Sequence, residues 1–144
     1  MVTVARADIP TIDAASAPYW EAARQGRLLI AECASCGRVH HYPRPFCPHC
    51  WSEDVHPIPA TGAGTLYTYS TVYVNDLAPF RERLPYVAAL VELDEGPRLM
   101  TTIEGAEPEG LRVGMRVDAV FRPVDDTDPE SAYLTTFTPA KEPS

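Results

Sequence analysis

The sequence predicts a mainly β protein, in which a short N-terminal helix and a four-cysteine ribbon precede a five-stranded barrel of the OB type. Three observations lead to this prediction. The four cysteines form two C-x2-C pairs, five β-prone runs fill the second half of the chain, and no long helical pattern separates those runs. Closing five strands into a barrel removes the exposed edges of an open sheet. A five-stranded sandwich is the competing architecture.

The chain divides into four expected segments. They are an N-terminal lead with a helix (1–26), a ribbon (27–60), the barrel (61–139) and a tail (140–144). The first ten residues show no periodicity, and we expect them and the last four to be flexible. The stretch Pro57–Ala60 disfavours regular structure, which suits a linker between the ribbon and the barrel.

The first element is a short helix that a glycine terminates. Asp13 or Ser16 can cap its start, because each offers a side-chain oxygen to the free N–H groups of the first turn. The run Ala17–Gln25 has an early proline and a late arginine, as helices prefer. So short a helix is marginal in water and needs a surface to pack on. Tyr19 and Trp20 are the expected contacts, either with the chain's own body or as docking residues for a partner.

The second element is a ribbon that opens with a strand over residues 27–32. Two residues separate the cysteines within each pair and ten separate the pairs, so two tight turns can present four sulfurs to one ion. This spacing predicts a zinc site with Zn–S distances of about 2.3 Å. The expected ligands are Cys33, Cys36, Cys47 and Cys50. Four sulfur ligands leave no open position, so the expected role of zinc is structural.

Other interpretations of the ribbon stay open. Its knuckles resemble those of rubredoxins, so iron with one-electron transfer is one alternative, and free thiols or a redox pair are another. The first thirty residues hold no apolar run long enough for a signal peptide or a membrane span, which predicts a cytoplasmic protein with reduced thiols. We expect the nearby histidines to be bystanders, with His40 and His41 on a surface strand, His49 in solvent, and His56 unliganded.

Five β-prone runs follow, with glycine and proline at the turns between them. They span residues 65–74, 86–93, 98–103, 116–122 and 132–138. Asp94–Pro97 supplies a tight turn that makes the second and third runs a hairpin. In the first run, alternation places Leu66, Thr68, Ser70, Val72 and Val74 on one face, and Tyr67, Tyr69, Thr71 and Tyr73 on the other.

Charge and missing motifs narrow the function. The formal net charge is -8, and residues 61–144 carry fourteen acids against seven basic residues, so binding to nucleic acid or to an anionic membrane is not expected. The sequence has no glycine-rich phosphate loop, no G-x-S-x-G elbow and no H-E-x-x-H helix. Its acids lie mainly in turns, where little burial is available to shift their pKa values. We therefore expect no self-contained active site.

The order of these motifs resembles that of the zinc-ribbon plus OB-fold acyl-CoA-associated proteins. The resemblance covers about residues 11–138 and rests on Tyr19-Trp20, the cysteine pairs within 33–50, Pro85–Gly96 and Leu111–Val117. Members of this family accompany thiolase-fold enzymes, which include acyltransferases and the lipid-transfer-protein-like aldolases that shorten CoA-linked sterol side chains. Some are fused to a hotdog-fold hydratase. The resemblance implies a hetero-oligomer in which the partner subunit carries the catalytic residues.

For this chain, the resemblance implies an accessory subunit that is not catalytic alone. It would help to complete the acyl-CoA site of a thiolase or aldolase, with structural zinc and with a CoA thioester as the shared substrate. The loop Asn75–Pro85 is our candidate for contact with CoA or the partner, through Phe80, Arg81 and Arg83, because arginine pairs well with phosphate. The alternative is an ordinary solvated loop, in which Glu82 balances the arginines.

Two other functions stay open as alternatives. An OB barrel with exposed tyrosines can stack the bases of single-stranded nucleic acid, and Tyr67, Tyr69 and Tyr73 are the candidates, although the charge opposes this function. A rubredoxin-like electron carrier follows if the metal is iron. Metal analysis and visible absorption distinguish that carrier from a zinc protein.

Overall fold

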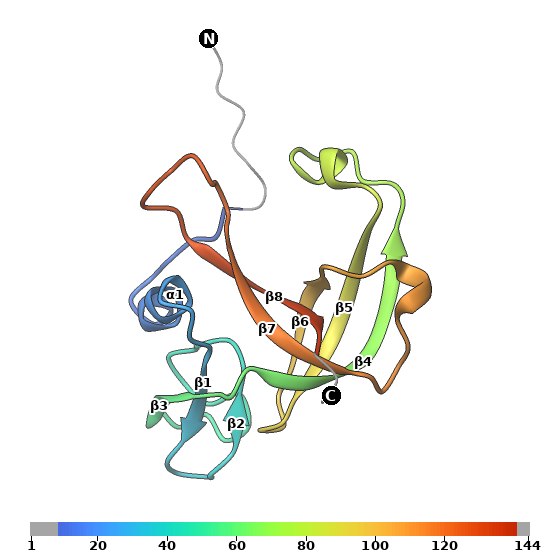
Figure 1. The fold of residues 1–144 in the computed structure, drawn as a ribbon. Helices are drawn as coiled ribbons and strands as arrows, with labels where there is room; N and C mark the ends of the chain where they lie inside the picture. Colours follow the sequence, from blue (N-terminus) through green and yellow to red (C-terminus); the bar gives the residue numbers. More distant parts are fainter. Residues whose placement is uncertain (1–8, 141–144) are drawn as a thin grey trace.

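The computed structural model describes residues 9–140, and the predictions made for residues 1–8 and 141–144 lie outside this range. The N-terminal part holds α1 (Ala17–Arg24), β1 (Leu29–Cys33), β2 (Val39–His40) and β3 (Val55–Pro59). The barrel strands are β4 (Ala63–Val72), β5 (Tyr86–Leu93), β6 (Arg98–Ile103), β7 (Arg116–Pro123) and β8 (Tyr133–Pro139). Two 3-10 helices, η1 (Phe80–Arg83) and η2 (Pro108–Gly110), lie in the barrel loops. Figure 1 shows α1 and the small sheet together on one side of the barrel. Within the described range, neither α1 nor the 3-10 helices could cross a bilayer.

Asp13 and Ser16 bond to each other in the turn that precedes α1, but Ser16, the N-cap residue, makes no side-chain hydrogen bond to the first turn of the helix. The N–H of Ser16 donates to Oδ1 of Asp13 at 2.8 Å, and the N–H of Asp13 donates to Oγ of Ser16 at 3.0 Å. This reciprocal pattern is that of a capping box. At the other end, Gly26 has a positive φ of 79° and ends the helix, as predicted.

The ribbon contains a three-stranded antiparallel sheet with β1 in the centre. The prediction of an irregular linker at Pro57–Ala60 was wrong, because most of this stretch belongs to β3. β3 lies at the edge of the sheet, where a strand can accommodate Pro57 and Pro59. Since proline has no N–H, these two residues also discourage a further strand from pairing there.

The five barrel strands pair in the order β4-β5-β6-β8-β7 and close on themselves. The pairs are antiparallel except for β6 and β8, which run parallel and meet at Ile103 and Phe137. The predicted OB-type barrel is therefore confirmed, and the sandwich was the wrong alternative. Arg116 of β7 forms a bidentate ion pair with Asp94 in the β5–β6 turn, with both N–O distances at 2.8 Å.

Strict alternation along β4 was a wrong prediction. The pairing with β5 shifts register between Leu66 and Thr68, so Tyr67 is the extra residue of a β-bulge. Leu66 is fully buried, and Tyr69 also packs against the core, where its hydroxyl donates to the carbonyl of Leu111 at 2.9 Å. A shift of one residue moves every later side chain to the opposite face of a strand.

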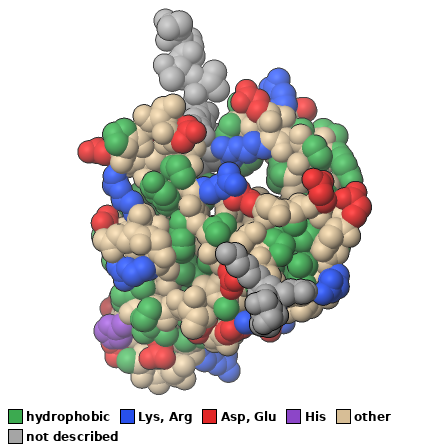
Figure 2. Space-filling view, viewed as in Figure 1, with side chains coloured by type: hydrophobic (Ala, Val, Ile, Leu, Met, Phe, Trp, Pro, Cys, Tyr) green, Lys and Arg blue, Asp and Glu red, His purple; other side chains and the backbone are tan. Residues whose placement is uncertain are grey.

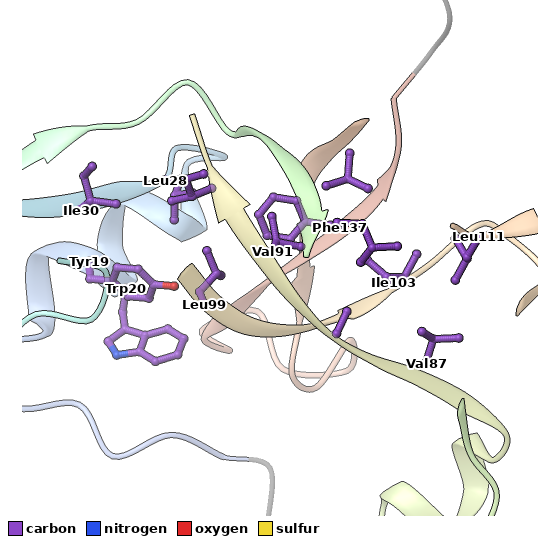
Figure 3. Close-up of a cluster of buried hydrophobic side chains, with 14 residues drawn as sticks. Tyr19, Trp20, Leu28, Ile30, Val87, Val91, Leu99, Ile103, Leu111 and Phe137 are labelled. Atoms are coloured by element: carbon purple, nitrogen blue, oxygen red, sulfur yellow. The ribbon is translucent and has the colours of Figure 1, made fainter. Parts of the chain in front are cut away.

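One hydrophobic core joins the helix, the ribbon and the barrel. Figure 3 shows Tyr19 and Trp20 of α1 in the same cluster as Ile30 of β1 and Val91 and Phe137 of the barrel. Tyr19 and Trp20 are buried in this cluster. The sequence left two roles open for Tyr19 and Trp20, packing on the chain's own body and docking on a partner. The structure shows the first, because both side chains are buried in the chain's own core.

Candidate functional site

The four cysteine sulfurs meet at one point of the ribbon. The Sγ atoms of Cys33, Cys36, Cys47 and Cys50 all lie within 4.8 Å of one another. Sγ of Cys33 is 3.6 Å from that of Cys50, and Sγ of Cys36 is 3.7 Å from that of Cys47. A tetrahedral ion with sulfur at about 2.3 Å has sulfur–sulfur edges of about 3.8 Å. The cluster therefore has the size that a four-thiolate zinc site requires.

The two knuckles that carry these sulfurs share one backbone pattern. The N–H of Gly37 donates to the carbonyl of Cys33 at 2.8 Å, and the N–H of Trp51 donates to that of Cys47 at 2.9 Å. A hydrogen bond from the backbone of Cys36 is the main cause that lowers the pKa of the Cys33 thiol to about 7, whereas burial and the neighbouring thiols raise the pKa of Cys50 to about 12. A lower pKa favours the thiolate form that binds metal ions.

The histidines near this cluster lie partly where the sequence did not place them. The expectation of a surface position for His40 was wrong, since His40 is 7% exposed and neither of its ring nitrogens has a hydrogen-bond partner among the described residues. The segment that carries Arg44 and His49 comes close to it. His41 is half-buried, whereas His49 and His56 are exposed. The cluster of metal-binding side chains includes none of the four histidines.

A small network of polar aromatic contacts joins the helix, the ribbon and the barrel. The hydroxyl of Tyr19 lies 3.3 Å from Nε2 of His41 and 3.2 Å from Oγ1 of Thr135 in β8. Nε1 of Trp20 donates to the hydroxyl of Tyr42 at 3.3 Å. These contacts connect the ribbon to the barrel and shield His41 from water.

The position of His41 predicts that the fold is sensitive to acid between pH 6.5 and about 4. Burial first, and then the charge of His40, lower the pKa of His41 from 6.5 to about 4. In this range the unfolded chain binds a proton that the folded chain excludes. The free energy of unfolding should therefore fall as the pH falls, by roughly 3 kcal/mol in all.

Urea unfolding of the wild type and of the His41→Gln variant, at several pH values from 7 to 4, measures this contribution. We expect His41→Gln to show a smaller decrease over the range, while His56→Gln, at an exposed site, keeps the wild-type decrease. Equal decreases in the wild type and in His41→Gln would rule out the role given to His41.

A second candidate site is a cleft of about 880 Å³ at one end of the barrel. It lies between the loop that carries η1 and the loop that joins β7 to β8, and Figure 2 shows the surface hollowed there, with basic side chains at its margin. Phe80 and Arg83 line the cleft together with Tyr86 and Thr102. Arg81 instead donates to the carbonyl of Asp76 at 2.9 Å, within the loop. The structure thus brings two of the three predicted loop residues to one cleft.

Acidic side chains outnumber basic ones in this cleft. Its charged lining consists of Arg83, Arg122, Glu82, Glu104, Asp125 and Asp126. Arg122 forms an ion pair with Glu104, and Oγ1 of Thr136 donates to the same carboxylate at 3.0 Å. The excess of negative charge disfavours binding of a diphosphate group in the cleft. It is compatible with binding of an uncharged acyl chain or of a protein surface.

The outer face of β5 and β6 carries two uncharged residue pairs that sequence reasoning overlooked, beside the ion pair of Glu92 with Arg98. Alternate residues of β5 are buried, so Ala88 and Leu90 point outward, where they pair with Thr102 and Met100 of β6. Met100 is 79% exposed. A sheet face in contact with water normally carries polar side chains. The apolar run Tyr86–Val91 was the signal in the sequence, because it lacks the alternation of a half-exposed strand.

The three tyrosines that suggested base stacking do not share one surface. Tyr69 packs against the core, and Tyr67 is 44% exposed but has one face of its ring occupied by Arg98, whose Cζ lies 3.8 Å from the ring centre. Tyr73 is exposed near the end of β4. The feature on which the nucleic-acid alternative rested is therefore not present as a stacking platform.

Family models and curated relatives match most of the chain. The rubredoxin-like zinc ribbon domain of ChsH2 matches residues 20–56, and the C-terminal OB-fold domain of ChsH2 matches residues 58–122. A probable enoyl-CoA hydratase alpha subunit of Thermomonospora curvata is 40% identical over 131 residues, which cover 91% of this chain and 39% of that protein. The chain thus spans well under half of that relative. A DUF35 domain-containing scaffold protein of Methanocaldococcus jannaschii is 38% identical over 117 residues, which cover 78% of this chain and 81% of that protein.

A solved structure also matches both parts of the chain. It is described as the Ltp2-ChsH2(DUF35) aldolase, and its matching chain is 40% identical, with a TM-score of 0.76. The match covers 90% of this chain and 98% of the other. The comparison therefore agrees with the ribbon and barrel described above.

Proposed function

Because this chain belongs to the ChsH2 family of zinc-ribbon and OB-fold proteins, we propose that it is an accessory subunit of a thiolase-fold enzyme acting on acyl-CoA substrates. The names of its relatives support this function, since they include an alpha subunit, a scaffold protein and an aldolase complex with Ltp2. In finer terms, the enzyme is a thiolase, an acyltransferase or a retro-aldol lyase of sterol side-chain degradation. A CoA thioester is then the shared substrate.

The outer face of β5 and β6 is the observation that carries this proposal. Its central pair, Leu90 and Met100, is apolar, and one neighbouring pair, Ala88 and Thr102, is uncharged, while the other, Glu92 and Arg98, is an ion pair at the margin. A strand with apolar residues on both faces is typical of a strand that is buried on both sides. Burying one large apolar side chain contributes about 1.5–3 kcal/mol. A partner protein that covers this face therefore accounts for its composition.

In this proposal the four cysteines hold zinc, which has a structural role. Cys33 and Cys47 are fully buried, and the distances between the sulfurs fit a tetrahedral ion. When bound, the metal supplies a rigid cross-link between the two knuckles and leaves no position for substrate or water. The reacting groups are then those of the thiolase-fold subunit, and this chain gives the complex its shape.

The barrel cleft extends from the proposed interface. Thr102 belongs both to the outer face of β5 and β6 and to the lining of the cleft. Because carboxylates predominate there, we place the uncharged part of the acyl-CoA, or the partner, against the cleft, and not the phosphates. Phe80 and Arg83 are the proposed contacts, while Arg81 stabilises their loop through Asp76.

Co-expression of the chain with each thiolase-fold enzyme of its source organism tests the proposal. We expect one of these enzymes to form a complex that persists in size-exclusion chromatography at micromolar concentration, with the mass of a hetero-oligomer by light scattering. Acyl-CoA turnover should require the enzyme subunit. Separate elution from every such enzyme, or full turnover by the isolated chain, would overturn the proposal.

A further inference from the structure

Two sulfur–sulfur contacts join the two knuckles of the cysteine cluster. Sγ of Cys36 lies 3.7 Å from that of Cys47, and Sγ of Cys50 lies 3.6 Å from that of Cys33. Cys36 and Cys50 are exposed, whereas Cys33 and Cys47 are fully buried. Each of the two exposed cysteines therefore has a buried cysteine of the opposite knuckle beside it.

Metal binding keeps these sulfurs in the form that oxidants attack. Cysteine binds zinc as the thiolate, and the thiolate is also the nucleophile that reacts with peroxides. Cysteines that are oxidised reversibly are exposed thiolates with a second cysteine near enough to form a disulfide. Cys36 and Cys50 meet both conditions. The buried sulfur of Cys47 is better protected, because it also accepts a hydrogen bond from the N–H of His49 at 3.3 Å.

We propose that Cys36 and Cys50 are oxidation sites, at which hydrogen peroxide converts the cluster into two disulfide bonds between the knuckles. The bonds are Cys36–Cys47 and Cys33–Cys50. The inference goes beyond the proposed function and does not depend on it, because it concerns the chemistry of this chain alone. In the reduced form, the four cysteines keep the structural role described above.

The reaction consumes one peroxide molecule for each disulfide. The exposed thiolate attacks one oxygen of hydrogen peroxide, so the O–O bond breaks and a sulfenic acid and a hydroxide ion form. The buried thiolate then attacks the sulfur of the sulfenic acid, so the S–S bond forms, the S–O bond breaks and a second hydroxide ion leaves. The two sulfurs together lose the two electrons that reduce the peroxide. Because the first disulfide leaves only two ligands, the ribbon then releases the metal.

Disulfides between the knuckles keep the connection that the metal provides. A metal held by all four sulfurs joins the turn at 33–37 to the turn at 47–51, and both proposed bonds join the same two turns. Bonds within a knuckle, Cys33–Cys36 and Cys47–Cys50, would leave the turns unconnected. The oxidised ribbon thus keeps its knuckles together, and reduction by a thiol restores the four ligands.

Hydrogen peroxide added in small steps to the zinc-loaded chain tests the inference. A chromogenic chelator should detect complete release of zinc by about two peroxide molecules per chain, and dithiothreitol with added zinc should reverse the change. Trypsin cleaves after Arg38, between the knuckles, so bonds between the knuckles join two tryptic peptides. Mass spectrometry should find these peptides joined, with fragments that assign the two proposed bonds. Separate peptides, or sulfinic acids without disulfides, would overturn the inference.

The double variant Cys36→His/Cys50→His removes both exposed sulfurs and keeps four metal ligands, since two cysteines and two histidines also bind zinc. We expect it to bind zinc and to release it with peroxide at least about tenfold more slowly than the wild type. Cys36→His alone should form the Cys33–Cys50 bond and no other. Peroxide-dependent release from the double variant at the wild-type rate would show that the exposed cysteines are not the oxidation sites. If the double variant binds no zinc, the peptide mapping of the wild type decides the question.

Discussion

Replacing Cys36 with serine is expected to unfold the ribbon and to abolish binding of the enzyme subunit. The ribbon sheet has strands of five, two and five residues, which is too little structure to be stable by itself. Structural zinc sites have apparent binding free energies of about 10–16 kcal/mol at neutral pH, more than most domains have in total stability. The free energy lost with one of the four ligands should therefore be larger than the free energy that packing against the barrel contributes to the ribbon.

Metal analysis and backbone NMR spectra of Cys36→Ser measure this effect. Barrel resonances should persist, because the barrel closes around buried residues of its own strands, whereas ribbon resonances should lose their dispersion. Ser35→Ala is the control, since Ser35 is exposed beside the ligand and contacts Oγ of Ser52 at 2.8 Å. A complex that forms and turns over without metal would contradict the role given to zinc. Visible absorption of the purified protein would point to iron instead.

Replacing Met100 with glutamate is expected to weaken the complex by about a hundredfold or more without unfolding the chain. Met100 is 79% exposed in the isolated chain, so the change should alter the free energy of unfolding by less than about 0.5 kcal/mol. In the complex, the new carboxylate would be buried against an apolar surface with no partner, which costs several kcal/mol.

Val113→Glu is the matched control for Met100→Glu. Val113 is 65% exposed and lies in the turn before β7, away from the pairs that form the outer face of β5 and β6. Titration calorimetry should give a wild-type Kd for this control. An unchanged Kd in Met100→Glu would exclude the outer face as the interface. Wild-type dimers that Met100→Glu converts to monomers would show that a second copy covers this face.

The features that could be predicted from the sequence are those that depend on local chemistry. The cysteine spacing indicates four ligands, because two short C-x2-C turns that bind the same ion must each present two sulfurs to it. The hairpin at Asp94–Pro97 and the stop at Gly26 follow from the backbone preferences of proline and glycine in the same way. Five β-prone runs without long helices leave few architectures, and closure of the sheet favours the barrel.

Other features depend on contacts between distant segments, which local patterns do not encode. The bulge at Tyr67 depends on how β4 pairs with β5 and reverses the faces of later residues. His40 is buried because the segment with Arg44 comes close to it, and the barrel cleft forms between two loops far apart in the chain. The positive φ of Trp51 has no signal in the sequence except that Gly37 occupies the equivalent place.

Steady-state turnover of an acyl-CoA substrate by the thiolase-fold subunit, measured with and without this chain, tests the central claim most directly. We expect the zinc-loaded chain to raise kcat/KM about tenfold or more, and Met100→Glu to remove the increase at concentrations where the wild-type chain saturates it. If the enzyme subunit forms the complex yet turns over equally well without the chain, this protein does not help to complete an acyl-CoA site.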